Sequence, residues 1–214
     1  MSDRRRYPDR FQDIAINAVR CADCFVDGNL QRPLVDRAQP RWIGPGYLNS
    51  TPRIVFMMLN PGGGESRHDT ADARLRDLLH RFASGEDTLN AIMDHQRADF
   101  PNWGRGRFLQ FLDLAGLNLE KIVLMNIAWC ATSMNKYPAS MLRNCFQRHT
   151  QSALSALEPD VVILSGTAIH TYAQRVHAAL PNAKVISTLH YANREGAQAT
   201  ESAADEVKMA IKSA

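Results

Sequence analysis

Four short and almost wholly apolar segments recur along the chain. They are rich in Val, Ile, Leu and Met, and they lack the apolar–polar alternation of a strand with one wet face. Such runs are typical of strands that are buried on both faces of a sheet. The four predicted strands span residues 53–59, 121–128, 160–166 and 184–190.

The segments between these strands repeat their apolar residues at helical spacing. Helices are therefore predicted over residues 70–83, 105–116, 139–157, 167–179 and 201–213. The polar stretch 84–104 predicts instead a lid or a loop that faces a substrate. Strands that alternate with helices indicate an α/β fold, here a three-layer α/β/α sandwich around a mostly parallel four-stranded sheet.

Composition places the chain among ordinary globular domains. It has 214 residues, of which 45% are hydrophobic and 22% charged, so we expect one domain over residues 1–214, with 1–14 as a flexible basic terminus. No apolar run reaches the roughly 18 residues of a membrane span, and the N-terminus lacks the apolar core of a secretory signal. A cytoplasmic monomer is expected. The net charge of +3 permits a polyanionic partner without requiring one.

Polar side chains follow three of the predicted strands where each strand ends. Asn60 follows the first, Asn126 lies at the end of the second, and His190 closes the fourth. In a parallel sheet the carboxyl ends of the strands meet at one edge, and ligands bind in the crevice there. Each residue alone is compatible with a turn or a cap. Together the three indicate a polar site at this edge.

A run of three glycines, Gly62 to Gly64, follows Asn60-Pro61 in "MLNPGGGES". It has no following Lys-Ser or Lys-Thr pair, so it is not a phosphate-binding loop, and it also lacks the G-x-G-x-x-G pattern of dinucleotide sites. Glycines allow a tight turn and bring backbone amides close to a ligand. The run therefore favours a planar ligand packed against bare backbone.

Four cysteines are present, and in a cytoplasmic protein they are expected to be reduced. Cys21 and Cys24 form a CxxC pair, and Cys130 and Cys145 follow later in the chain. Four thiolates suit an iron–sulfur cluster or zinc. Four unrelated buried thiols remain an open alternative, because free Cys is a common small core residue.

Four motifs together resemble the uracil-DNA glycosylase superfamily, and most closely its iron–sulfur branch, family four. They are "MLNPGGGES", "VLMNIAWC", "VVILSGTAIHTYA" and "TLHYAN", and the resemblance covers about residues 15 to 212. The spacing of the four cysteines resembles that branch's cluster ligands. The resemblance therefore implies a 4Fe-4S cluster held by Cys21, Cys24, Cys130 and Cys145, with zinc as the alternative.

The resemblance also implies roles for the residues at the strand ends. Asn60 is expected to hold the attacking water, and His190 to stabilise negative charge on the leaving base. Asn126 is expected to pair with the polar edge of the base, while the backbone amides of Gly62 and Gly63 bind its O2 atom. The iron–sulfur branch usually has Glu where this chain has Leu59. The Asn-Pro-Gly sequence instead resembles the mismatch-specific and single-strand-selective branches.

Members of the family stack the flipped base on an aromatic ring, and here Phe100 and Trp103 both qualify. The loop that enters DNA is expected at Tyr191, Asn193 and Arg194. Tyr191-Ala192 replaces the family's usual Pro-Ser in this loop, so its shape is not fixed by the resemblance.

The expected function is that of a monofunctional DNA glycosylase, which hydrolyses the N-glycosidic bond of a flipped-out pyrimidine and leaves an abasic site. Uracil is the family's usual substrate. The small glycines at 62–64 leave room beside C5, so a 5-substituted or hypermodified cytosine of phage DNA is an alternative, which would make this a defence enzyme. No lysine lies at these strand ends, so lyase chemistry is not expected. A non-catalytic iron–sulfur DNA-binding protein of the same fold is the alternative from another class.

Overall fold

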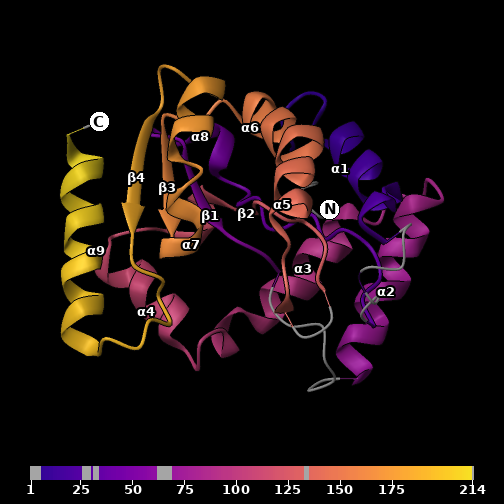
Figure 1. Ribbon diagram of the computed structural model, residues 1–214, viewed down its shortest axis with the longest axis horizontal. Coiled ribbons are helices and arrows are strands. Elements are labelled where there is room, and N and C mark those ends of the chain that lie inside the picture. Colours follow the sequence, from indigo (N-terminus) through magenta and orange to yellow (C-terminus); the bar gives the residue numbers. More distant parts are fainter. Residues whose placement is uncertain (1–5, 26–29, 31–33, 62–68, 133–134, 214) are drawn as a thin grey trace.

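The computed structural model describes residues 6–25, 30, 34–61, 69–132 and 135–213, without the side chains of 69–72. Four strands lie side by side among helices (Figure 1). The strands are β1 (Ile54–Met58), β2 (Ile122–Asn126), β3 (Val161–Ser165) and β4 (Lys184–Thr188). All four predicted strands are present. The ends of each strand lie within two residues of the ends that the apolar run predicted.

All four strands are parallel, in the order β2-β1-β3-β4. Strand β1 is central, and its Val55 pairs with Val123 on one side and Val162 on the other. Every residue of β1, β2 and β3 is buried, whereas the edge strand β4 is mostly half-exposed. This agrees with the absence of alternation in the apolar runs, since helices cover both faces of such a sheet.

Helices form the two outer layers of the sandwich. On one side α4 (Arg107–Leu114) packs against α9 (Ala197–Lys212), and the ring of Phe56 in β1 lies 6.1 Å from that of Phe108 and 5.9 Å from that of Phe111 in α4. On the other side α6 (Gln151–Leu157) packs against α8 (Ala173–Ala179) and α1 (Phe11–Arg20). The longer helices are α1 (Phe11–Arg20), α2 (Asp69–Ala83), α3 (Leu89–Asp99), α4 (Arg107–Leu114), α5 (Ala139–Cys145), α6 (Gln151–Leu157), α8 (Ala173–Ala179) and α9 (Ala197–Lys212). The predicted three-layer α/β/α fold is confirmed.

The prediction of a loop over residues 84–104 is wrong. Most of this stretch is helix α3, followed by a 3₁₀ turn at Phe100–Asn102. The α3 residues Leu89, Ile92, Met93 and Gln96 are buried at spacings of three and four. A narrow apolar stripe was therefore present, but the Asp and Asn residues around it on the solvent side gave the segment a polar average.

The expected flexible terminus does not extend as far as residue 14. Helix α1 begins at Phe11, and its residues Phe11, Ala15, Ala18 and Val19 are buried against the rest of the molecule. The Tyr7 hydroxyl donates a hydrogen bond of 2.6 Å to Asn90 Oδ1 in α3. The basic start of the chain is therefore attached to the fold from at least Tyr7 onward, because burial of one helix face offsets the entropy of ordering it.

Helix ends depart from the sequence prediction in small ways. The predicted helix 139–157 is α5, a π-helical segment at Phe146–Thr150, and α6 in succession, and 167–179 is split into α7 (Thr167–His170) and α8. Gly116 follows the end of α4 in the left-handed region, with φ of 69°. Its N–H donates to the Asp113 carbonyl and that of Leu117 to the Leu112 carbonyl, which closes the helix as a Schellman motif.

Among the described residues, no helix combines the length and apolar character that a bilayer crossing requires. The parallel sheet brings the carboxyl ends of its strands to one edge of the molecule. In Figure 1 the arrowheads of β3 and β4 both point toward α7. The loops that follow the strands therefore gather at this edge, where the predicted site residues lie.

Candidate active site at the carboxyl edge of the sheet

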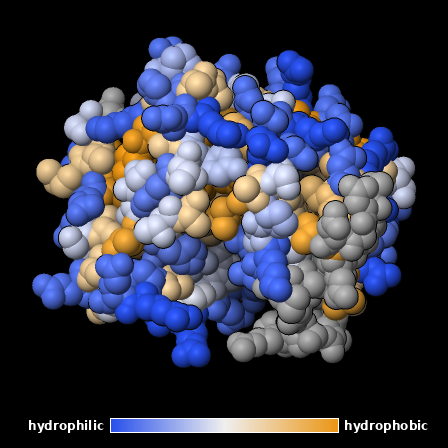
Figure 2. Space-filling model, in the orientation of Figure 1, coloured by the Kyte–Doolittle hydropathy of each residue, from blue (hydrophilic) through white to orange (hydrophobic). Residues whose placement is uncertain are grey.

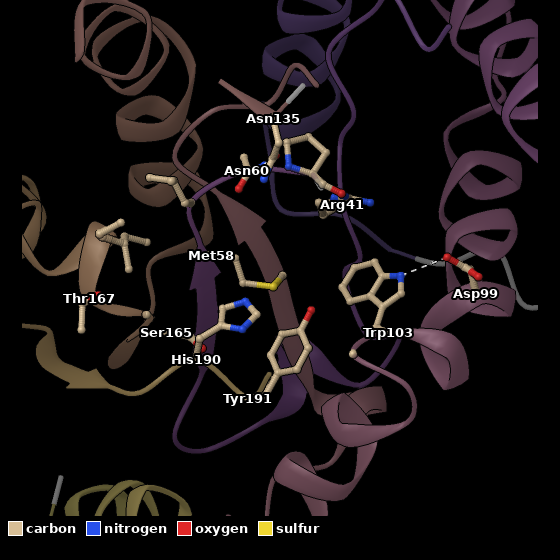
Figure 3. A pocket seen from close by; sticks show the side chains of 16 residues that line it. Arg41, Met58, Asn60, Asp99, Trp103, Asn135, Ser165, Thr167, His190 and Tyr191 are labelled. Atoms are coloured by element: carbon tan, nitrogen blue, oxygen red, sulfur yellow. Dashed lines mark hydrogen bonds between the residues drawn. The ribbon is translucent and has the colours of Figure 1, made fainter. Parts of the chain in front are cut away.

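A cavity of about 560 Å³ opens at this edge (Figure 3). Its wall comes from segments that are far apart in the sequence. The lining includes Arg41, residues 58–61 from the end of β1 onward, Asp99, Trp103, Asn135, residues 165–169 from the end of β3 onward, and His190 with Tyr191. Asn60 and His190 thus meet at one cavity, as the strand pattern predicted.

Asn60 is half-buried and its side-chain amide is held in place by a neighbour. Its Nδ2 donates a hydrogen bond of 2.6 Å to Asn135 Oδ1. Asn135 has a φ of 55°, in the left-handed region that Asn tolerates better than most residues. Because Nδ2 already has an acceptor, the amide is oriented to offer Oδ1 as an acceptor to a water molecule.

His190 presents a neutral ring with a defined tautomer. Its Nδ1 accepts a hydrogen bond of 3.1 Å from the Ala192 backbone N–H, so the ring proton of the neutral form lies on Nε2. Burial lowers the pKa of His190 below its ordinary value, which keeps the ring uncharged at neutral pH. The ring packs closely on Gly166, where an added Cβ would lie 3.4 Å from His190 Cβ. His190 therefore supplies one N–H donor to the cavity.

The two aromatic candidates occupy different environments. Phe100 is fully buried in the core, with its ring 6.0 Å from that of Trp42 and 5.8 Å from that of Phe108. Trp103 is only partly buried and lines the cavity, and its Nε1 donates to Asp99 Oδ2 at 3.2 Å. Trp103 is thus the ring that a ligand in the cavity can contact.

Asn126 lies beneath the cavity and does not line it. The side chain is 1% exposed. With the amide turned to suit its surroundings, Oδ1 accepts from Arg41 Nε at 2.9 Å, and Nδ2 donates to the carbonyls of Asn60 and Met125 at 3.2 Å. Asn126 was expected to recognise a base through its side-chain amide. Both polar atoms of that amide are already hydrogen-bonded within the protein. In this conformation Asn126 instead holds Arg41 and the end of β1.

Arg41 is a cavity residue that the sequence analysis did not identify. It is 8% exposed, and burial lowers the pKa of its guanidinium to about 10. Its Nη2 donates to the Pro61 carbonyl at 2.5 Å, and its guanidinium carbon lies 5.1 Å from the centre of the Trp103 ring. Residues 34–46 show neither helical nor strand periodicity, so no sequence signal distinguished this arginine from the others.

The loop after β4 is built around His190. Tyr191 lines the cavity, with its ring 4.1 Å from that of His190 and 5.1 Å from that of Phe108. Burial raises the pKa of Tyr191 to about 12. Asn193 Nδ2 donates to the His190 carbonyl at 3.1 Å, and its Oδ1 accepts from the Glu195 N–H at 2.9 Å. Asn193 therefore shapes this loop, whereas Tyr191 faces the cavity.

Exposed arginines surround a second hollow beside this loop. Arg194, the third residue predicted to contact DNA, lines it together with Arg105 and Arg107, and Arg107 also donates to the Asn193 carbonyl at 3.0 Å. We call this surface the arginine groove. Figure 2 shows hydrophilic side chains gathered over the lower edge of the molecule, below α4 and the segment that leads into α9.

Two predicted base contacts, Gly62 and Gly63, lie outside the described residues, so their expected role stays a prediction. Pro61, immediately before them, lines the cavity. The chain therefore leaves β1 along the cavity wall as far as the structure describes it.

The four cysteines come from four segments around one region. Cys21 follows α1 directly, Cys24 lies in a 3₁₀ turn, Cys130 is buried after β2, and Cys145 is the last residue of α5. Burial raises the pKa of Cys145 to about 12, and the charges of Cys24 and Cys21 act in the same direction. These three thiols are thus near enough to interact electrostatically. We call the four residues the cysteine region.

The cysteine region has the thiol donors that a soft metal prefers. Cys145 Sγ accepts a hydrogen bond of 3.2 Å from the Trp129 N–H, a contact that suits a metal-bound thiolate. Within the described ranges, however, no three Cys, His, Asp or Glu side chains are grouped as metal ligands. The iron–sulfur cluster and zinc both stay predictions.

No protein-family model matches this chain, and no curated protein is detectably similar to it in sequence. The resemblance to the uracil-DNA glycosylase superfamily therefore stays a prediction, which depends on the four motifs.

Proposed function

We propose that the protein is a monofunctional DNA glycosylase that hydrolyses the N-glycosidic bond of a flipped-out pyrimidine. The observation that carries the proposal is the meeting of Asn60, His190 and Trp103 at one cavity. These residues supply a water-holding amide, an N–H donor and an aromatic face. A glycosylase needs these three functions to take a base out of the stack and cleave it from the sugar.

The reaction assigns a separate task to each polar residue. When the bond between C1′ and N1 breaks, its electron pair leaves with the base, and the base becomes an anion. The His190 Nε2–H donates to this anion as its charge develops, which is worth about two to three orders of magnitude in rate for one well-placed donor. Asn60 holds the water whose oxygen adds to C1′, and a proton from that water is finally transferred to the base.

The side chains at the cavity favour hydrolysis over lyase chemistry. A lyase needs an amine that forms a Schiff base with the sugar. Among the described residues that line the cavity there is no lysine, and the basic groups are Arg41 and His190. The product of the proposed reaction is therefore an abasic site with an intact strand.

The arginine groove supports DNA as the partner. Arg105, Arg107 and Arg194 are exposed next to the loop that carries His190 and Tyr191. A net charge of only +3 does not by itself attract a polyanion strongly. Three guanidinium groups beside the cavity mouth do so locally, because each can neutralise one phosphate.

The dimensions of the cavity leave room for a base with a substituent. A volume of about 560 Å³ lies within the range of roughly 300–1,000 Å³ typical of pockets for drug-sized ligands. This is more than one pyrimidine ring requires. We therefore keep uracil as the default substrate and a 5-substituted or hypermodified cytosine of phage DNA as the alternative, which implies a role in phage defence.

We further propose that the cysteine region holds a metal with a structural role, a 4Fe-4S cluster in preference to zinc. Its ligands would be Cys21, Cys24, Cys130 and Cys145. Such a group would tie the chain after α1 to the loop after β2 and to the end of α5. No step of the proposed reaction depends on it.

The test is a base-excision assay with duplex and single-stranded oligonucleotides that carry uracil, thymine, 5-hydroxymethylcytosine or glucosylated hydroxymethylcytosine. Excision of at least one base, with loss of activity in Asn60→Ala and His190→Ala, is the expected result. Tight DNA binding without excision of any base would instead indicate the non-catalytic alternative. If the protein neither binds DNA nor excises any of these bases, the proposal as a whole is contradicted.

A further inference from the structure

Arg41 is a buried cation at the cavity. Its side chain is more than nine-tenths buried and contributes to the cavity wall. Among the described residues, no Asp or Glu forms an ion pair with it. Against the burial that lowers the pKa of Arg41, the charge of Asp99 raises it slightly, but the Asp99 carboxylate accepts hydrogen bonds from Trp103 and Asn102.

The hydrogen bonds of Arg41 account for part of its donor capacity. Nε donates to Asn126 Oδ1 at 2.9 Å, and Nη2 donates to the Pro61 carbonyl at 2.5 Å. A guanidinium carries five N–H donors in a rigid fork, so three of them are not used by these two bonds. The two hydrogen bonds fix the plane of the guanidinium group, so the directions of its other three N–H groups are fixed before a ligand binds.

A purely structural role does not explain why this residue is charged. A buried charge is unfavourable unless it is paired, and the lowered pKa of Arg41 reflects that desolvation. The two acceptors of Arg41 are neutral oxygens, and a neutral side chain can donate to both. The Trp103 ring, 5.1 Å from the guanidinium carbon, offers a cation–π contact that offsets part of the desolvation. An anion in the cavity would offset much more.

We propose that Arg41 is a second donor to the leaving base, which binds a carbonyl oxygen of the pyrimidine as it becomes negatively charged. This inference depends on the proposed glycosylase function and adds a specificity residue to it. After heterolysis of the N-glycosidic bond, the electron pair on N1 is delocalised onto the carbonyl oxygens of the base. Water supplies the oxygen that adds to C1′ and the proton that finally neutralises the base. Arg41 itself neither gains nor loses a proton.

The positions of the two donors support a division of the charge between them. Figure 3 shows Arg41 and His190 on different sides of the cavity, with the Trp103 ring on the same side as Arg41. A base between them can place one oxygen near each donor while Trp103 contacts its face. Because His190 is neutral, Arg41 supplies the formal positive charge that this arrangement otherwise lacks among the described cavity residues.

The test compares leaving bases of different acidity. Duplexes carry either uracil or 5-fluorouracil at one position. Because fluorine withdraws electrons, the 5-fluorouracil anion is more stable and depends less on a donor from the protein. We expect Arg41→Gln to slow single-turnover excision of uracil on the order of 100-fold, in line with loss of one preorganised donor. Excision of 5-fluorouracil should slow by less than about 10-fold, below the usual effect of losing one donor, because this base stabilises its own negative charge better. Arg41→Lys should restore part of the uracil rate.

Arg97 provides a matched control. Its guanidinium also lies over an indole ring, 5.2 Å from the centre of Trp42, but it pairs with Glu120 away from the cavity. Arg97→Gln should leave the ratio of the two rates unchanged. Thermal melting of each variant shows whether it is folded. Equal slowing of both bases in a folded Arg41→Gln protein would overturn the proposal and leave Arg41 as a support for Pro61 and Asn126.

A binding measurement separates this proposal from the proposed function. Free 5-fluorouracil is titrated into wild-type protein and Arg41→Gln near neutral pH and in mildly alkaline buffer, where more of the base is anionic. We expect the wild-type affinity to rise with pH and the variant's affinity to stay flat. If wild type excises no base but shows this rise, the function fails and the anion site stands. No binding, or the same rise in both proteins, contradicts the anion site.

Discussion

The cavity and the cysteine region are both built from segments that are distant in sequence, but they differ in what holds their side chains in place. At the cavity, hydrogen bonds within the protein orient the key groups, since Asn135 holds Asn60 and the Ala192 N–H fixes the tautomer of His190. In the cysteine region the thiols lie near one another, yet among the residues that the structure describes no three side chains are grouped as metal ligands. The protein alone organises the first region, whereas the proposed metal would organise the second.

The difference implies opposite responses to mutation. Groups that are already oriented contribute to the transition state and little to the fold, so their loss changes rate more than stability. Ligands that become ordered only with a metal contribute its binding energy to folding. Variants in the cavity should therefore lose activity and keep their stability, whereas variants in the cysteine region should lose stability.

The largest effect is expected in the cysteine region. Cys130→Ser and Cys145→Ser each remove a buried thiol, and loss of a structural metal costs several kcal/mol of folding free energy. We expect both variants to lose metal, visible colour and soluble yield. Metal analysis after anaerobic purification and thermal melting provide the measurement. Full metal content and an unchanged melting temperature in both variants would indicate four unrelated thiols.

The next effect is expected at the cavity. Asn60→Ala and His190→Ala should each lower the single-turnover excision rate by about two to three orders of magnitude, because each removes one group that acts in the transition state. Their melting temperatures should stay close to that of wild type. Phe100→Leu, which alters the core beneath Trp103, is the opposite control and should lower stability with little effect on rate. Near-native rates in either cavity variant would contradict its assigned role.

The pH dependence sharpens the assignment of His190. Burial lowers its folded-state pKa below the ordinary value of 6.5, so below pH 6.5 the unfolded chain binds the proton more readily than the folded protein. By linkage, stability is greatest above pH 6.5 and decreases as pH falls toward the folded-state pKa. We expect denaturant titrations to show this acid-side loss in wild type and a smaller loss in His190→Gln. An identical pH profile in both proteins would argue against a buried neutral imidazole.

The smallest effects are expected in the arginine groove. Arg105→Gln, Arg107→Gln and Arg194→Gln should each weaken DNA binding a few-fold and reduce the slope of log affinity against log salt by about 0.9 for each phosphate contact on duplex DNA. Lys212→Gln, at the far end of α9, is the control for a change in net charge. Salt titrations of binding provide the slopes. If Lys212→Gln has the same effect, the groove has no special role.

Local sequence determined much of the fold. The four runs became strands because Val, Ile, Leu and Met dominate them, and a sheet covered by helices on both faces buries such residues. The buried polar residues Asn126, Ser165 and Thr188 stand only at the last position of their strands. Gly116 marked the end of α4 because a left-handed residue is needed there. The start of α1 was missed because it follows the basic residues that indicated a flexible terminus. Helix α3 was missed because its buried stripe is narrow and polar residues dominate its average. The partners that cover such a stripe are not visible in the local sequence.

At the site, the apolar runs already showed which polar residues follow the strands, and parallel pairing brings Asn60 and His190 together at one edge. The packing of distant segments selected the neighbours of these residues. It placed Phe100 in the core and Trp103 at the cavity, and it joined Asn126 to Arg41. The physical reason is that a strand end fixes where a side chain starts, whereas its direction and its partners depend on segments that pack there from elsewhere in the chain. Arg41, from a segment without periodicity, is the clearest example of a residue whose environment exists only in the folded protein.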